Sequence, residues 1–370
     1  MNRLQELKLQ GQSVWLDYIR RDILESGELR RLIEVDGISG LTSNPAIFEQ
    51  AIGGSDLYDA AIGRLLSDSA PDDVEALYES IAIDDIQSVA DILRETYDET
   101  ERRDGFVSFE VSPHLARDAA GTLEAARRLW RQIDRPNLMI KIPATGEGLI
   151  AIEESLADGI NVNVTLMFSL EHYEAVAQAY LRGAARADQP SQLASVASFF
   201  VSRVDSKIDG LLEEIGTEKA LALRGKIAIA NSKLAYRRFQ EIFEGPDFAE
   251  LRDRGTAVQR VLWASTSTKN PAYRDVIYAE ELIGPETVNT MPPSTIEAFR
   301  DHGISRLSLL EDVEAAARAV RQLTDLGIDL ARATEELQVE GLTKFAQPFD
   351  RLLETLREKS EEVMQSRRAM

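Results

Sequence analysis

The sequence contains no cysteine among its 370 residues and only three histidines. The absence of cysteine excludes disulfide bonds, thiolate metal sites and a cysteine nucleophile, and it is consistent with a reducing compartment. His114, His172 and His302 are isolated in the sequence and lack the spacing of metal ligands, so we expect them at surface or helix positions. The sequence therefore predicts chemistry that uses neither a metal nor a cofactor.

Long apolar runs are also missing. The first seven residues, MNRLQEL, do not form an apolar signal core, and no uninterrupted apolar run approaches the roughly 18 residues needed to span a bilayer. Acidic residues outnumber basic ones by 63 to 42, and the formal net charge of -21 repels nucleic-acid backbones and anionic membranes. We therefore expect a cytoplasmic protein without a nucleic-acid or membrane partner; the sequence leaves a homo-oligomer open.

Short apolar runs alternate with helical stretches along the chain, a pattern typical of parallel α/β folds. Several runs are apolar at successive positions, as are strands that are covered on both faces. Most of their starts lie about 22 to 35 residues apart, which brackets the roughly 31 residues per unit of an eight-unit barrel. The predicted strands are residues 14–19, 37–43, 106–111, 138–144, 160–168, 195–204, 260–266 and 286–291.

The pattern predicts one (β/α)8 TIM barrel domain over residues 1–370, with a core at about 14–327 and a helical C-terminal extension at about 328–370. Additional helices are expected in two long gaps, one with Pro71, Asp72 and Asp73 at a helix start and one over residues 217–243. The letters STIE at residues 294–297 match a capping box. The first gap also carries a one-sided apolar stripe, formed by Ile86, Val89, Ala90, Leu93 and Tyr97.

An open doubly wound sheet is the alternative to a barrel. The letters GEGLIA at residues 146–151 follow a strand, open a helix and match the glycine pattern of a dinucleotide site. Such a site also expects an acidic residue about 20 positions later, and the letters TLMF at residues 165–168 provide none. We therefore interpret the glycines as a tight turn and predict no dinucleotide cofactor.

Polar residues near the C-terminal ends of the predicted strands are the candidates for chemistry, because reactive groups of TIM barrels lie at that end. They come from seven of the eight strands. The candidates are Asp17, Asn44, Glu110, Lys141, Asn163, Thr165, Ser198, Arg203, Ser265 and Lys269.

Lys141 lies in the apolar run LMIKIP at residues 138–143. An amine that loses hydration has a lowered pKa and a larger neutral fraction able to attack a carbonyl. A lysine at a strand end can equally cover the core with its stem while its ammonium reaches water, and Asp17 and Glu110 could be structural partners of buried basic residues. The convergence of these three ionisable groups from three strands at one rim favours catalysis.

Five segments resemble the signature segments of transaldolases, and the resemblance covers about residues 15–293. It implies a barrel of the class I aldolase type and, in the pentose phosphate pathway of the cytoplasm, transfer of a dihydroxyacetone unit between sugar phosphates. The letters WASTSTKNP at residues 263–271 resemble the longer subgroup, some of whose members are fused to a phosphoglucose isomerase. The five segments are LTSNP at 41–45, VSFEV at 107–111, IKIPAT at 140–145, GINVNVTL at 159–166 and SFFVSR at 198–203.

The resemblance also implies catalytic roles. Lys141 would attack the ketose carbonyl and form a Schiff base. Glu110 would supply the proton for loss of water, acting through a water held by Thr165. Asp17 would take the proton from the C4 hydroxyl as the C3 to C4 bond breaks.

Substrate-binding roles follow from the same resemblance. Asn44, Asn163 and Ser198 match the residues that hydrogen-bond the dihydroxyacetone hydroxyls, and neutral donors suit this task. Arg203 and Ser265 match phosphate ligands. Shorter relatives carry an arginine two residues after that serine, where this chain has Ser267, so Lys269 is a hypothesis for the second cation.

Two other functions are compatible with parts of this pattern. One is a Schiff-base fructose 6-phosphate aldolase, which releases its product to water; relatives with that activity replace the residue matching Glu110 with glutamine. The other is a barrel that has lost catalysis and serves as a binding protein. The presence of Lys141, Asp17 and Glu110 together argues against the second.

Overall fold

The computed structural model describes residues 2–68 and 73–368, in which eight parallel strands form one closed barrel in chain order. The last strand pairs with the first, with Gln12 opposite Thr287, so the sheet has no free edge. The predicted TIM barrel is therefore confirmed, and the open sheet is excluded. The strands are β1 Gln12–Asp17, β2 Ile38–Thr42, β3 Phe106–Glu110, β4 Leu138–Pro143, β5 Val162–Met167, β6 Ser195–Phe200, β7 Arg260–Ala264 and β8 Thr287–Met291.

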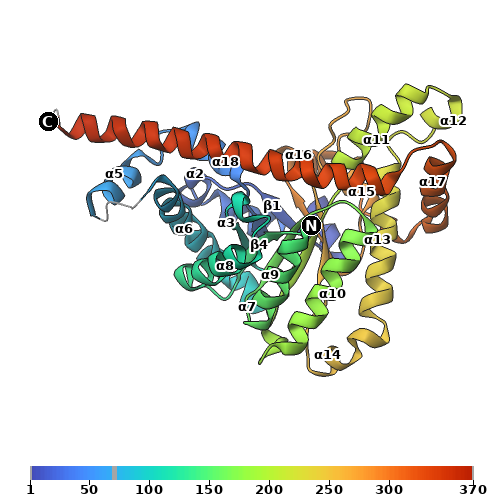
Figure 1. Ribbon diagram of the computed structural model, residues 1–370, viewed down its shortest axis with the longest axis horizontal. Coiled ribbons are helices and arrows are strands. Elements are labelled where there is room, and N and C mark those ends of the chain that lie inside the picture. The colour runs from blue at the N-terminus through green and yellow to red at the C-terminus, as the bar shows by residue number, and fades with distance from the viewer. Residues whose placement is uncertain (1, 69–72, 369–370) are drawn as a thin grey trace.

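Helices surround the barrel (Figure 1). In chain order they are α1 Arg3–Leu9, α2 Arg21–Glu25, α3 Glu28–Arg31, α4 Pro45–Gly53, α5 Asp59–Asp68, α6 Val74–Ile92, α7 Arg94–Glu99, α8 Ala119–Ile133, α9 Gly146–Ala157, α10 Leu170–Arg186, α11 Ser202–Ile215, α12 Glu218–Leu221, α13 Ile227–Phe243, α14 Ala249–Asp253, α15 Ile277–Glu281, α16 Pro293–His302, α17 Val313–Asp325 and α18 Leu330–Arg368. A π-helical turn, η1 Leu32–Asp36, lies between α3 and β2. The 3-10 turns in the described part of the chain are η2 Pro113–Leu115, η3 Pro190–Gln192, η4 Pro246–Phe248 and η5 Ser308–Leu310. No helix among the described residues is both long enough and apolar enough to cross a bilayer.

The additional helices lie in the two long gaps, as predicted. All five members of the apolar stripe at residues 86–97 are buried in or beside α6 and α7. The side chain of Asp73 caps α6 by accepting a hydrogen bond from Ala76 N at 2.8 Å, whereas Pro71 and Asp72 lie outside the described residues. The stretch at residues 217–243 is two helices, α12 and α13.

Three local predictions are wrong at strand and helix boundaries. The sixth strand was predicted over residues 195–204 but ends at Phe200, and residues 202–204 belong to α11. Val201 and Val204 are apolar because they are buried at the start of this helix, and not because they belong to the sheet. The letters STIE do not form a capping box, because α16 already begins at Pro293, whose fixed φ and missing N–H suit a first helical position.

The glycines of GEGLIA do not form a tight turn; they lie in the first turn of α9. The Thr145 side chain caps this helix by accepting from Gly148 N at 2.9 Å. A Cβ at Gly148 would lie 2.0 Å from the carbonyl oxygen of Pro143, so only glycine allows α9 to start this close to the end of β4.

The last helix, α18, lies across the barrel and contacts α4, α5 and β5. Figure 1 shows it in red, extending past the strands as far as α5. Gln338 Nε2 donates to two carbonyl oxygens. One belongs to Ala144, just after β4, at 3.0 Å, and the other to Leu166 in β5, at 3.1 Å. The helix passes close to β5 at Gly341, where a Cβ would lie 2.9 Å from Leu166 Cδ2. The helical extension predicted from about residue 328 therefore packs against the carboxyl ends of the strands.

Candidate active site

A cavity of about 480 Å³ opens at the carboxyl ends of the strands and is lined by residues from several strands, their following loops and α18. Two further candidates, Glu110 and Asn163, lie directly behind this lining and contact Lys141 and Ser198. The structure therefore brings all the candidates into one place. Those that line the cavity are Asp17, Asn44, Lys141, Thr165, Ser198, Arg203, Ser265 and Lys269.

Lys141 is 5% exposed, and its amine contacts one acceptor in the neighbouring strand β3 and one just after β2. Its Nζ donates to the carbonyl oxygen of Ser43 at 3.1 Å and to Glu110 Oε2 at 3.2 Å. Glu110 is opposite Lys141 in the register of β3 and β4, which explains the pairing. The sequence predicted an amine in apolar surroundings, whereas the amine is hydrogen-bonded and ion-paired.

The two carboxyl groups near this amine have raised pKa values. Burial raises the pKa of Glu110, the positive charge of Lys141 opposes the shift, and the negative charge of Asp17 adds to it. Burial likewise raises the pKa of Asp17, against the charge of Lys141 and a hydrogen bond from Thr42 Oγ1 at 2.8 Å. Both groups are thereby brought closer to the pH range in which a carboxyl can exchange a proton during a reaction.

Neutral polar groups form a continuous row on the neighbouring strands. Ser198 Oγ donates to Asn163 Oδ1 at 2.7 Å, and Asn163 Nδ2 donates to Ser108 Oγ at 2.9 Å. Thr165 Oγ1 is buried and has no hydrogen-bond partner in the part of the chain that the structure describes. A buried hydroxyl without a partner in a cavity wall is available for a ligand or a water molecule.

Asn44 has a structural task as well as a place in the cavity. It caps α4, where its Oδ1 accepts from Ala46 N at 3.1 Å and from Ile47 N at 3.2 Å. The side-chain oxygen Oδ1 is thus engaged, so the side-chain Nδ2 group is the part that can donate to a ligand.

Cationic and hydroxyl side chains gather in another part of the cavity. Arg203 comes from the first turn of α11, and its guanidinium carbon lies 5.1 Å from the centre of the Phe200 ring. Its Nη1 is buried without a hydrogen-bond partner among the described residues, and burial lowers its pKa. Ser265 Oγ lies 3.0 Å from Ser202 Oγ. An unpaired guanidinium group beside hydroxyl groups can bind a phosphate.

Lys269 belongs to the loop after β7 and donates from Nζ to Ser267 Oγ at 2.7 Å. Although much of the residue is exposed, partial burial of its amine and the charge of Arg203 lower its pKa. The neighbouring positive charge of Arg203 indicates that an anion between the two groups would be stabilised by both.

Several residues that line the cavity were not among the sequence candidates. Thr42 and Thr290 share a hydrogen bond of 2.6 Å between their Oγ1 atoms below Asp17. Lys344 and Phe345 come from α18, and the centre of the Phe345 ring lies 5.2 Å from Lys141 Nζ. The threonines stand on strand ends and could have been found there. The residues of α18 carry no local signal, because a helical pattern does not reveal which distant surface the helix covers.

The histidines lie apart from this cavity. His114 is in the 3-10 turn Pro113–Leu115 and contacts Asp350, His172 in α10 contacts Glu335, and His302 ends α16 and contacts Asp275. Their predicted surface or helix positions are confirmed. Within residues 2–68 and 73–368, no group of three or more His, Cys, Asp and Glu side chains could hold a metal ion.

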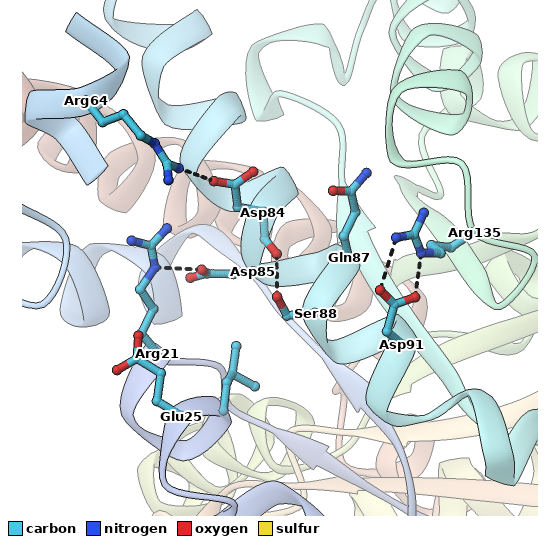
Figure 2. A pocket seen from close by; sticks show the side chains of 10 residues that line it. Arg21, Glu25, Arg64, Asp84, Asp85, Gln87, Ser88, Asp91 and Arg135 are labelled. Carbon is cyan, nitrogen blue, oxygen red and sulfur yellow. Dashed lines mark hydrogen bonds and ion pairs between the residues drawn. The ribbon is translucent and has the colours of Figure 1, made fainter. Parts of the chain in front are cut away.

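A second cavity, of about 430 Å³, is visible in Figure 2. Each of its arginines is paired with a carboxylate: Arg21 Nε lies 2.8 Å from Asp85, Arg64 lies 3.1 Å from Asp84 and Arg135 lies 2.6 Å from Asp91. Because the arginines drawn are already neutralised by carboxylates, this cavity offers less to an anionic ligand than the one at the strand ends.

The fold and the cavity together define a (β/α)8-barrel protein that holds a buried amine beside carboxyl groups, with cations and hydroxyls in the same cavity. The sequence matches the family described as Transaldolase/Fructose-6-phosphate aldolase over residues 14–356. The chain belongs to this family.

Curated relatives match almost the whole chain. The chain is 48% identical to transaldolase 2 of Nostoc punctiforme, and the alignment covers 97% of both chains. It is 46% identical to the transaldolase of Trichodesmium erythraeum, again with 97% of both chains covered. Identity to the transaldolase of Mycolicibacterium smegmatis is 45%, with 95% of both chains covered.

Proposed function

We propose that this chain is a transaldolase that transfers a dihydroxyacetone unit through a lysine Schiff base. Sedoheptulose 7-phosphate and glyceraldehyde 3-phosphate would give erythrose 4-phosphate and fructose 6-phosphate. The observation that carries the proposal is the buried contact of 3.2 Å between Lys141 Nζ and Glu110 Oε2 in a cavity that Asp17 also lines. Family membership and relatives named transaldolase support it.

In this reaction Lys141 attacks the ketose carbonyl and a carbinolamine forms. Glu110, with its raised pKa, supplies the proton for loss of water, through a water molecule held by the Thr165 hydroxyl. Asp17 takes the proton from the C4 hydroxyl while the C3 to C4 bond breaks, and the iminium accepts the electron pair. The remaining enamine attacks the second aldehyde, and the reverse steps release the product.

The rest of the cavity orients the substrate. Asn44, Asn163 and Ser198 hydrogen-bond the hydroxyls of the dihydroxyacetone unit, while Arg203 and Ser265 bind the phosphate. Lys269 supplies the second positive charge as a point donor, since it lacks the bidentate geometry of an arginine. This cycle needs neither a metal nor a cofactor.

The cellular setting remains a prediction. We expect the protein to act in the pentose phosphate pathway of the cytoplasm, with sugar phosphates as partners. The absence of a nucleic-acid partner is likewise a prediction from the sequence, which leaves a homo-oligomer open.

The mechanism is tested by mixing the protein with fructose 6-phosphate, reducing with borohydride and mapping the adduct by peptide mass spectrometry. The adduct is expected on Lys141. Lys233 is an internal control, since it is also buried but its Nζ donates to the carbonyl oxygen of Glu311 away from the cavity lining. An unmodified Lys141 peptide, or an adduct on Lys233, would contradict the mechanism.

Transfer is separated from simple aldol cleavage by leaving out the acceptor aldehyde. Turnover should then almost stop if the protein is a transferase. Sustained release of dihydroxyacetone would instead support a fructose 6-phosphate aldolase, although Glu110 occupies the position at which such relatives have glutamine.

A further inference from the structure

Phe345 forms an aromatic wall over the reactive amine. It comes from α18, more than 200 positions after Lys141 in the chain, and is 7% exposed. Its ring centre lies 5.2 Å from Lys141 Nζ, and the residue lines the same cavity as Asp17 and Thr165. A phenyl ring offers no hydrogen bond, so a water molecule beside it loses partners that the polar side of the cavity would provide.

The backbone that carries this ring is attached on both sides. Two turns before Phe345, Gln338 donates hydrogen bonds to the carbonyl oxygens of Ala144 and Leu166. One turn after it, Phe349 packs edge-on against Tyr78, with ring centres 5.6 Å apart. Two residues later, Arg351 Nε contacts Glu49 of α4 at 2.6 Å. The ring is therefore a fixed part of the cavity wall.

We propose that Phe345 determines reaction specificity by excluding water from the covalent intermediate, so that the enamine is passed to an aldehyde and not released. This inference rests on the proposed transaldolase function. In the covalent intermediate the three-carbon unit is bonded to Lys141 Nζ. The atoms next to this nitrogen therefore lie beside the phenyl ring that covers it.

The enamine has two fates that differ at one carbon. In transfer, its C3 forms a bond to the aldehyde carbon of the acceptor, and the aldehyde oxygen gains a proton. In release, C3 gains a proton from water and the iminium forms; water then adds to the iminium carbon and the C–N bond breaks. Release therefore yields dihydroxyacetone and the free Lys141 amine, with one water consumed and no oxidant or reductant needed. Phe345 disfavours the first protonation by keeping water from C3.

A purely structural role for Phe345 is the alternative, because an apolar residue on one face of α18 also stabilises the packing of that helix. Phe349 provides the matched control. It lies one turn further along α18, is 2% exposed and packs on Tyr78 and His114, but it does not line the cavity. Truncation at either position removes a buried ring from α18, whereas only truncation of Phe345 opens the space beside Lys141.

The experiment compares wild type, Phe345→Leu, Phe345→Ala and Phe349→Ala with fructose 6-phosphate as donor. The rate of dihydroxyacetone release without acceptor is divided by the rate of transfer to erythrose 4-phosphate. Loss of an apolar contact changes discrimination by 10-fold or more, so we expect Phe345→Ala to raise this ratio by about tenfold. Phe345→Leu should raise it less, and Phe349→Ala should leave it unchanged.

The outcomes separate the inference from the proposed function. If wild type performs transfer and Phe345→Ala has an unchanged ratio, or if Phe349→Ala raises the ratio as much, the inference is overturned and the transaldolase proposal stands. If wild type neither transfers nor is trapped by borohydride at Lys141, both are overturned. Should Phe345→Ala fail to fold, the Phe345→Leu ratio decides, because leucine preserves a buried apolar side chain in the helix.

Discussion

Asp205 is expected to make the stability of this protein fall as the pH rises through the neutral range. It lies in α11, two residues after Arg203, and is 1% exposed. Its carboxyl group accepts hydrogen bonds from Ala228 N at 2.7 Å and from the Tyr278 hydroxyl at 2.9 Å. Burial nevertheless dominates and raises the pKa of Asp205 from 3.8 to about 7.

The direction of the effect follows from proton binding. In the unfolded chain the Asp205 carboxyl ionises near its ordinary pKa of 3.8, whereas in the folded protein it keeps its proton until about pH 7. The stability due to this proton is fully present below the unfolded pKa and is lost as the pH rises through the folded pKa. The whole pKa difference corresponds to about 4 kcal/mol, of which about 2 kcal/mol is lost between about pH 5.5 and about pH 8.5.

The test replaces Asp205 by asparagine, which is neutral at both pH values. Urea unfolding of wild type and Asp205→Asn gives the free energy of unfolding at each pH. The two proteins share every other titrating group, so their difference isolates Asp205. We expect the stability of Asp205→Asn relative to wild type to rise by about 2 kcal/mol from the lower to the higher pH. Parallel pH profiles would refute the reasoning.

Three further changes address the site and α18. Lys141→Met should abolish the borohydride adduct and lower kcat by about 10⁴-fold or more in an assay with fructose 6-phosphate and erythrose 4-phosphate, and a smaller loss would argue against covalent catalysis. Arg203→Ala should raise KM for fructose 6-phosphate by about 30-fold or more, with little change for unphosphorylated fructose; equal effects on both sugars would exclude a phosphate contact. Gln338→Ala removes two partly buried hydrogen bonds and should cost about 2 kcal/mol of stability, measured by urea unfolding. An unchanged midpoint would show that other contacts hold α18.

Much of the fold could be predicted from local patterns. The strands are short buried segments covered on both faces, in which apolar residues predominate overall, and most of their bounds could be placed within two residues. The predicted bounds were wrong where the adjoining residues gave a misleading local signal. Val201 and Val204 extend the apolar run of β6 but lie at the start of α11, and Pro293 starts α16 before the capping letters.

The candidate site could be predicted in part for the same reason. Asp17, Glu110 and Lys141 lie within or at the end of a strand, and parallel strands in a barrel direct those ends to one rim. The barrel topology therefore brings these residues together once the strands are known. Their proposed chemical roles rest on the family resemblance and on the tests above.

What the sequence alone determined is the identity of the strands and of the polar residues at their ends, because these depend on neighbours a few positions away. Only the tertiary structure decided that the barrel closes, that Glu110 stands opposite Lys141, and that Phe345 covers that amine. These contacts depend on strand register and on where a long helix packs. Register and helix packing are set by the fit of whole surfaces from distant parts of the chain, which no local pattern contains.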